Sequence, residues 1–122
     1  MATLTLDYGA AARTARRVVA GVCADAETGS ECADAAVLMT SELVTNAVLH
    51  GAGDVRLAVE AGDDNLRVEV TDDERRRPTL PSIDDDAEGG RGVFIVDALA
   101  SAWGVQDVPG GKLVWFEIST QP

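Results

Sequence analysis

The sequence predicts an α+β fold in which one mainly antiparallel sheet carries helices on one face. Two observations favour this fold. Apolar residues recur at helical spacing in the first fifty residues, whereas two later regions alternate apolar and polar residues as half-buried strands do. Helices and strands are therefore partly segregated along the chain. A length of 122 residues is typical of one domain, so we expect a single unit over residues 1–122.

The first half of the chain is predicted to hold one short strand and two helices. Residues 3–6, TLTL, alternate polar and apolar side chains. Residues 11–24 carry their apolar side chains along one helical stripe. The segment DAETGSE is typical of a turn, and a second helix is predicted over residues 32–50. The glycines at 51 and 53 are good signals for its end.

The second half is predicted to hold two hairpins separated by a long loop and a short helix. Residues 55–59 and 66–70 alternate around AGDDN, and AWGVQDV and KLVWFEIS flank the turn PGG. The loop, residues 73–90, contains two prolines, three consecutive arginines and three consecutive aspartates. We interpret it as a mobile lid, since long loops in compact domains are usually functional or disordered. The short helix is predicted over residues 92–100.

Composition limits the function and the location. Acidic residues outnumber basic ones 21 to 10, for a net charge of −11, which argues against a non-specific nucleic-acid binder. We find no run of 18 apolar residues and no signal-peptide pattern, so we expect a cytoplasmic protein without a membrane association. In that reducing compartment Cys23 and Cys32 are expected to be free thiols, and a disulfide between them is the less favoured alternative.

The segment MTSELVTNAVLHG places three polar residues along one stripe of an otherwise apolar helix. Glu42, Asn46 and His50 are spaced four residues apart, so they lie close to one line on the helix surface. Taken alone, a Glu–Asn pair at this spacing is usually the wet edge of an amphipathic helix. The functional interpretation therefore depends on what other segments add.

Two other segments add the chemistry that nucleotide binding requires. Asp72 ends a predicted strand, where a carboxylate can accept a hydrogen bond from the amino group of adenine. The segment EGGRGVFIV places a glycine-rich turn at the predicted start of a helix, whose amides can hold phosphate oxygens. An amide oxygen can coordinate Mg²⁺, and a carboxylate near the γ-phosphate can accept a proton from an attacking hydroxyl. The Rossmann and P-loop motifs are incomplete in this sequence.

The combined pattern resembles the GHKL (histidine-kinase-like) ATPase superfamily, and within it the small stand-alone serine-kinase anti-sigma factors of bacteria. SELVTNAVLHG is similar to their N-box, and GGRGVFIVDALASAWGV to their second glycine box. Asp72 and GGKLVWFEI follow the same order. The resemblance covers nearly the whole chain, from the first helix to the last strand, and the order and spacing of the boxes make it specific.

The resemblance implies a Bergerat-type two-layer α/β sandwich that binds ATP with Mg²⁺. By position, Asn46 would coordinate Mg²⁺ and Glu42 would be the general base that activates a serine of a partner protein. Asp72 would bind adenine. Gly90, Arg91 and Gly92 would frame the phosphates.

Several basic side chains keep two interpretations each. His50 either contacts the lid or the nucleotide, or satisfies the carbonyls at the helix C-terminus. For Arg91 we favour phosphate binding over plain surface. For Arg75, Arg76 and Arg77 we favour a solvated lid over a catalytic cluster.

Two departures from the family pattern concern the adenine side. The family usually has a glycine two residues after its Asp, where this chain has Glu74, and a threonine after the GK pair, where this chain has Leu113. A side chain in place of glycine restricts the backbone and brings atoms close to the expected position of adenine. We therefore carry weak or absent nucleotide binding as an alternative.

Three functions are compatible with these features. The first is a serine/threonine protein kinase that binds a sigma factor and phosphorylates an anti-sigma antagonist. The second is a partner-binding module of the same fold with weak or no ATP turnover. The third is the ATPase half of a split histidine kinase, which the chain supports least because it has no dimerisation helices of that kind. A homodimer is left open, because related proteins often dimerise.

Overall fold

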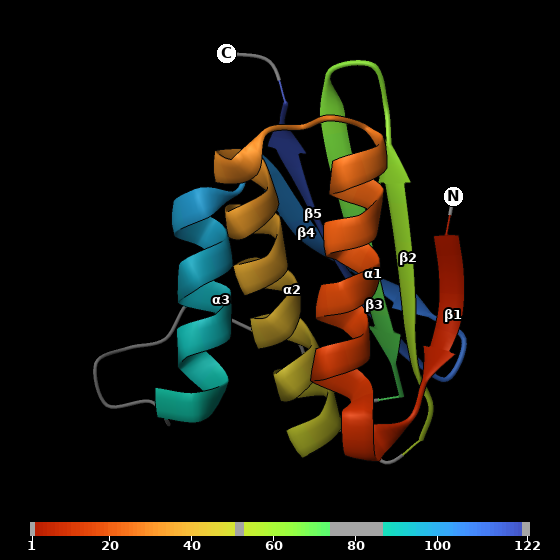
Figure 1. The fold of residues 1–122 in the computed structure, drawn as a ribbon. Helices are drawn as coiled ribbons and strands as arrows, with labels where there is room; N and C mark the ends of the chain where they lie inside the picture. Colours follow the sequence, from red (N-terminus) through yellow and green to blue (C-terminus); the bar gives the residue numbers. More distant parts are fainter. Residues whose placement is uncertain (1, 51–52, 74–86, 121–122) are drawn as a thin grey trace.

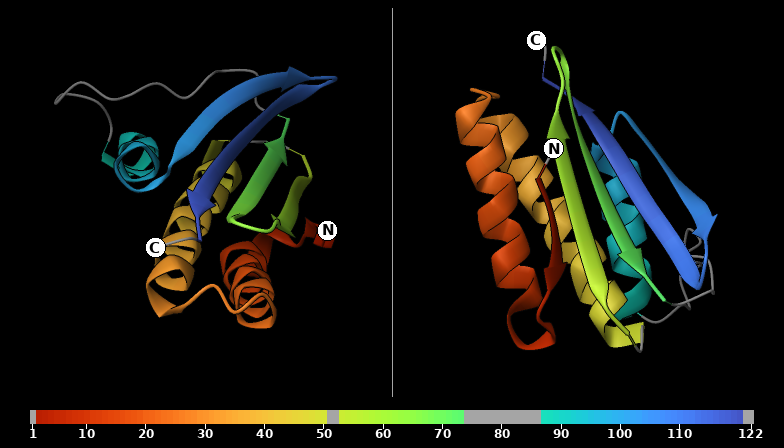
Figure 2. Two further views of the ribbon diagram at one scale, coloured as in Figure 1. Left: turned by 90° about the horizontal axis from the view of Figure 1, so that it is seen from above. Right: turned by 90° about the vertical axis from the view of Figure 1, so that its right-hand side faces the viewer.

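The computed structural model describes residues 2–50, 53–73 and 87–120, and it shows the predicted two layers. Figure 1 shows three helices side by side in front of a sheet, with α2 between α1 and α3. Seen from above, all three helices lie on the same side of the sheet (Figure 2). The structure confirms the prediction of an α+β sandwich with helices on one face.

The sheet has five strands in the order β1-β2-β3-β5-β4, and every neighbouring pair is antiparallel. The strands are β1 Ala2–Leu6, β2 Val55–Ala61, β3 Asn65–Asp72, β4 Ala102–Val108 and β5 Gly111–Ser119. The predicted strand and both predicted hairpins are confirmed. β5 follows β4 in the sequence yet lies inside the sheet, between β3 and β4.

The helical layer consists of α1 Ala11–Asp25, α2 Ser30–His50 and α3 Ala87–Leu99, with a 3-10 turn at Tyr8–Ala10. α1 buries four residues that are each four positions apart, which is the spacing of one helical face: Ala11, Ala15, Val19 and Cys23. α1 ends where Glu27 takes a left-handed φ of 56° and the Thr28 amide donates to the Cys23 carbonyl.

The central helix α2 is part of the core. By length and composition, Ser30–Leu49 is apolar enough to cross a membrane. Polar residues interrupt this segment, so it contains no unbroken run of 18 apolar residues. In this fold, however, α2 packs against the sheet and its two neighbouring helices. Its buried side chains include Ala36, Met39, Val44 and Ala47. Its apolar composition is therefore accounted for by burial within the domain.

The two cysteines are free thiols, as the sequence predicted. Cys23 lies near the end of α1 and is buried, whereas Cys32 lies near the start of α2 and is partly exposed. Burial raises the pKa of the Cys23 thiol above its ordinary value of 9.0, because the uncharged thiol is favoured away from water.

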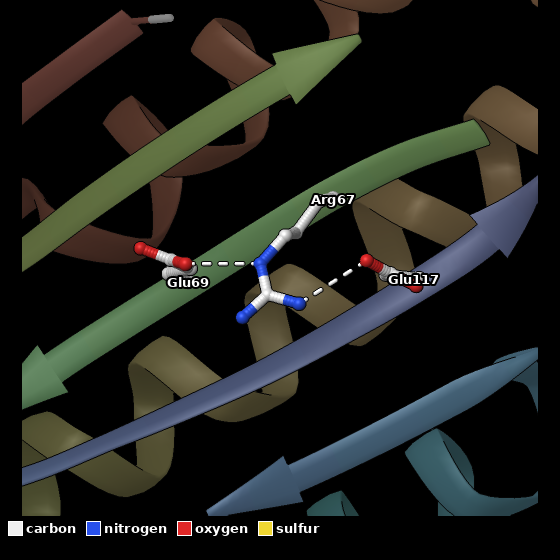
Figure 3. A network of polar contacts seen from close by, with 3 residues as sticks. All are labelled: Arg67, Glu69 and Glu117. Atoms are coloured by element: carbon white, nitrogen blue, oxygen red, sulfur yellow. Dashed lines mark hydrogen bonds and ion pairs between the residues drawn. The ribbon is translucent and has the colours of Figure 1, made fainter. Parts of the chain in front are cut away.

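The face of the sheet that points away from the helices carries a polar cluster around Arg67, shown in Figure 3. The Arg67 guanidinium donates to Glu69 at 2.9 Å and to Glu117, its cross-strand partner on β5, at 3.1 Å. It also lies 4.3 Å from the ring centre of Trp115. Burial lowers the pKa of Arg67, but the hydrogen bonds and charges of Glu69 and Glu117 outweigh it and raise that pKa. This cluster ties β3 to β5 on the outer face.

Candidate functional site

The predicted polar stripe lies on α2, at the margin of its buried face. Glu42 is buried, at 9% relative exposure, and Asn46 is partly buried one turn later, with its Oδ1 oxygen inside the protein. Leu43, Val44 and Ala47 next to them belong to the core. His50 is the last residue of α2, and the structure does not describe its side chain. The structure therefore supports the proximity of Glu42 and Asn46 but does not place the imidazole.

Gly92 brings α3 against α2 at the same point. A Cβ atom built on Gly92 would collide with the amide nitrogen of Asn46 and lie 3.4 Å from the carbonyl oxygen of Glu42. Only a residue without a side chain leaves this approach open. Gly92 thus meets the side chain of Asn46 and the backbone of Glu42 in one contact between two helices.

The helix that carries Gly92 begins earlier than the sequence predicted. The prediction placed a glycine-rich turn before a helix at residues 92–100, but α3 runs from Ala87 to Leu99 and includes Gly90, Arg91 and Gly92. Glycine is a poor helix former, so its local propensity argued for a turn, and the contact with α2 outweighs that preference.

The predicted lid falls largely outside the described residues. Residues 74–86 are not described, while the last part of the predicted loop, residues 87–90, forms the first turn of α3. The three arginines 75–77 and Glu74 are therefore not placed, and neither is the side chain of Arg91. Their predicted roles stay predictions.

Asp72 lies at the end of β3, on the side of the sheet that the helices cover. It shares this side with Val68 and Val70, and its own side chain is buried. Directly opposite, on β5, stands Lys112, whose Nζ donates to both carboxylate oxygens of Asp72 at 3.1 and 3.2 Å. The two side chains are only 4% and 9% exposed. Asp72 and Lys112 therefore form a buried ion pair between the sheet and the helical layer.

Sequence reasoning missed Lys112. The signal was present, because Lys112 alternates onto the same face of β5 as Val114 and Phe116, which are buried. A cation at the inward position of such a strand requires a buried acid. Lys112 is also the only lysine of the sequence.

Two glycines hold Lys112 opposite Asp72. Gly110 occupies the turn between β4 and β5 with a φ of 83°, a region that favours glycine. A Cβ atom on Gly111 would collide with the backbone of Asp72 and come within 2.7 Å of the Cα of Asp73. The GG of GGKLVWFEI therefore serves the close approach of β5 to β3.

The departure from the family pattern suggested that Leu113 lies beside Asp72. The structure instead places Leu113 on the opposite face of the sheet. Successive residues of a strand point to opposite faces, so Leu113, paired with Thr71, lies on the outer face of the sheet. The β5 side chain that contacts Asp72 is therefore Lys112 of the GK pair, and the interpretation of Leu113 is corrected.

The donor set suits a magnesium ion held together with phosphates. Among the described residues, no three His, Cys, Asp or Glu side chains gather into a metal-binding group. Mg²⁺ commonly takes one or two protein oxygens and completes its shell with water and substrate phosphates. The buried Oδ1 of Asn46, on the side chain whose amide nitrogen meets Gly92, is an oxygen of the kind that this role requires.

The sequence model of the histidine kinase-like ATPase domain matches residues 6–118. The chain belongs to this family. The match includes β2 to β4 entirely and contains Glu42, Asn46, Asp72, Gly92 and Lys112. This ATPase-like domain has no significant match among curated proteins.

Solved structures share the fold of this histidine kinase-like domain. The RsbU and RsbW domains of Rv1364c from Mycobacterium tuberculosis are 27% identical to it, with a TM-score of 0.75 over 99% of this chain and 33% of that one. The histidine kinase domain of a blue-light activated histidine kinase from Erythrobacter litoralis is 25% identical, with a TM-score of 0.55 over 91% and 60%. This chain therefore spans one third of the length of the mycobacterial structure.

A more distant structure shows the fold alone. The histidine kinase AdeS from Acinetobacter baumannii is 14% identical to this chain, with a TM-score of 0.54 over 100% of this chain and 69% of that one. Two of these three structures are thus described as histidine kinases and one as a protein with an RsbW domain.

Proposed function

We propose that this protein binds ATP with Mg²⁺ and acts as an anti-sigma regulatory protein with serine-protein kinase activity towards an anti-sigma antagonist. The observation that carries the proposal is the contact of Gly92 with Asn46 and with the carbonyl of Glu42, in a chain of the histidine kinase-like ATPase family. Asn46, the candidate magnesium ligand, and Glu42, the candidate base, are four residues apart on α2, which is about one helical turn. The similarity to a structure with an RsbW domain supports the anti-sigma type over a sensor kinase.

In this proposal each residue has a separate task. Mg²⁺, held by the Asn46 oxygen, would neutralise phosphate charge when ATP is bound. Glu42 accepts the proton of the partner's serine hydroxyl, so that its oxygen can attack the γ-phosphate. Asp72 binds the adenine ring, and Gly90, Arg91 and Gly92 frame the phosphates. His50 remains a candidate contact to the nucleotide.

The partners follow from the same proposal. A sigma factor, an anti-sigma antagonist or both would bind this domain in the cytoplasm, and a homodimer is compatible with it. The RsbU and RsbW domains that share one chain in the mycobacterial protein support a place among interacting regulators.

A second function is favoured by the Asp72–Lys112 ion pair. The carboxylate that would bind adenine already accepts two hydrogen bonds from Lys112. If a nucleotide cannot join this pair, the domain regulates by protein contact alone, with weak or no ATP turnover.

Calorimetric titration of Mg-ATP tests the pocket. We expect a dissociation constant in the micromolar range, about −8 kcal/mol, which Asn46→Ala abolishes and the matched variant Asn65→Ala preserves. Asn65 lies at the start of β3, outside the site. Absence of binding to the wild-type protein would favour the second function.

A phosphotransfer assay tests the role of Glu42. With a purified candidate antagonist as acceptor, Glu42→Gln should retain Mg-ATP binding and lose serine phosphorylation, detected by mass spectrometry, by a factor of about 100 or more. Glu60→Gln, a change at an exposed position of β2, is the control. Undiminished phosphorylation by Glu42→Gln would contradict its role as the base.

A further inference from the structure

The connection between α3 and β4 is fixed on the sheet at its second residue. Residues 100 and 101 alone join the end of α3 to the start of β4. The Ser101 amide donates to the Glu117 carbonyl of β5 at 2.8 Å, and the Ser101 hydroxyl accepts from the Ser119 amide at 2.9 Å. This connection is therefore a fixed pivot for α3, and the remaining variable is the angle at which the helix leaves it.

The angle of α3 decides how Gly92 meets α2. Gly92 lies eight positions before residue 100, which is about 12 Å along a helix that rises 1.5 Å per residue. A turn of about 10° at the connection would therefore move Gly92 by about 2 Å. Such a movement towards α2 is excluded by packing, because a single added carbon at Gly92 already collides with the Asn46 amide. A movement away from α2 would open the contact.

A hydrogen bond between Asp97 and Trp103 holds this angle. The indole Nε1 of Trp103 on β4 donates to the Oδ1 of Asp97 on α3 at 2.9 Å, across the connection. The Trp103 ring is partly buried and packs against the core, so its N–H group has a defined position. Asp97 lies about one turn before the pivot. A bond from this point to β4 therefore fixes the direction of the helix relative to the sheet.

The choice of residue at position 97 does not serve the helix itself. Asp97 places a negative charge in the last turn of α3, where it opposes the helix dipole. Aspartate is also a weaker helix former than alanine. Its side chain is exposed, so the core does not require it. The hydrogen bond to Trp103 is the interaction that accounts for an acid at this position.

We propose that Asp97 and Trp103 are positioning residues of the candidate nucleotide site, because their hydrogen bond holds α3 at the angle that seats Gly92 against Asn46. They act through α3 and not through contact with ATP. The effect on nucleotide affinity rests on the proposed function, whereas the hydrogen bond is a property of the protein without nucleotide. The two parts can therefore be tested separately.

Nuclear magnetic resonance with ¹⁵N-labelled tryptophan tests the hydrogen bond in the protein without nucleotide. The two tryptophans give two indole N–H signals, which Trp115→Phe assigns. The Trp103 N–H should exchange with solvent about tenfold more slowly in wild type than in Asp97→Ala. Asp97→Asn keeps an acceptor oxygen and should retain the slow exchange. Equal exchange in wild type and Asp97→Ala would overturn the inference and leave the proposed function untouched.

Calorimetry with Mg-ATP tests the effect on the site. Asp97→Ala removes an unfavourable charge and introduces a better helix former, so α3 itself is not weakened. Its affinity for Mg-ATP should nevertheless fall about tenfold, which is the upper range for the loss of one hydrogen bond. Asp97→Asn should bind as the wild type does. Unchanged or higher affinity of Asp97→Ala would show that residue 97 does not position the site.

The variant Trp103→Phe removes the donor and keeps an aromatic ring. It should lower the affinity for Mg-ATP about as much as Asp97→Ala, and the double variant should lose no more, since both changes remove the same bond. Trp115→Phe, on the outer face beside Arg67, is the matched control and should bind as wild type does. Additive losses in the double variant would overturn the inference. If the wild type does not bind Mg-ATP, the ATP-binding function and the positioning role both fail.

Discussion

At the scale of single residues, Gly92 has the most specific consequence for the site. In Gly92→Ala the added methyl group would displace the Asn46 amide, since the two groups would overlap. Overpacking of this contact should lower the free energy of unfolding by about 1–3 kcal/mol, which a domain with a typical stability of about 5–15 kcal/mol tolerates. The affinity for Mg-ATP should nevertheless fall tenfold or more, which calorimetry measures.

The control is the glycine in the middle of α1. Gly21 is exposed, and no heavy atom lies within 4 Å of a Cβ built on it. Gly21→Ala should therefore raise the free energy of unfolding by about 0.5–1 kcal/mol without an effect on nucleotide affinity. Equal Mg-ATP affinity of Gly92→Ala and wild type would show that the helix contact does not position Asn46 for binding.

Cys23 makes stability depend on pH in the alkaline range. Its pKa is raised by burial, so above the ordinary value of 9.0 the unfolded chain releases the thiol proton while the folded chain retains it. The folded state then binds more protons, and the free energy of unfolding falls as pH rises through this window. Below the window the contribution is fully present.

Urea denaturation between pH 7.5 and 10.5 measures this dependence. Cys23→Ala should have a shallower decline than wild type, whereas Val19→Ala, which truncates an apolar side chain on the same buried face of α1, should lower stability and keep the wild-type slope. A Cys23→Ala slope equal to that of wild type would assign the alkaline loss to other groups.

At the scale of elements, Arg67 connects β3 with β5 on the outer face. Lysine at this position retains the charge but loses the planar group that bonds two carboxylates and stacks over Trp115. The ion pairs of Arg67 with Glu69 and Glu117 are partly exposed to solvent. Arg67→Lys should therefore lower the free energy of unfolding by only about 0.5–1 kcal/mol.

Denaturation at low and high salt separates the two parts of this loss. The contribution of the ion pairs should shrink at high salt, while the stacking contribution persists. Arg56→Lys, at an exposed position of β2, serves as the control and should change stability by less than about 0.5 kcal/mol. Equal effects of the two substitutions would mean that the cluster does not stabilise the sheet.

At the scale of the whole molecule, the sequence predicted what local periodicity encodes. The alternation in residues 55–59 and 66–70 gave the first hairpin, and the stripes of α1 and α2 gave both long helices. The pairing of β3 with β5 joins residues 40 to 54 positions apart, and no local pattern contains it. The alternation of β5 marks Lys112 as an inward cation that needs an acid, but that this acid is Asp72 follows only from the pairing of the two strands.

The sequence identified residues of the candidate site but did not give the helix boundary next to it. Glu42, Asn46 and Gly92 were identified from motif spacing, and the structure brings them together. The predicted start of α3 was wrong. Glycines weaken a helix locally, but here they lie within one, where Gly92 makes a tertiary contact with α2. Local propensity cannot report such a contact, since the partner helix lies more than forty residues earlier.

The interior position of β5 also makes the order of folding matter. β4 has β5 as its strand neighbour, and β3 gains its second neighbour from β5. Until β5 docks, β3 presents an open row of backbone donors and acceptors, and such rows pair readily with other chains. The propensity of this protein to aggregate should therefore be greatest in a partly folded species that has formed β1, β2 and β3 and still awaits its last strand.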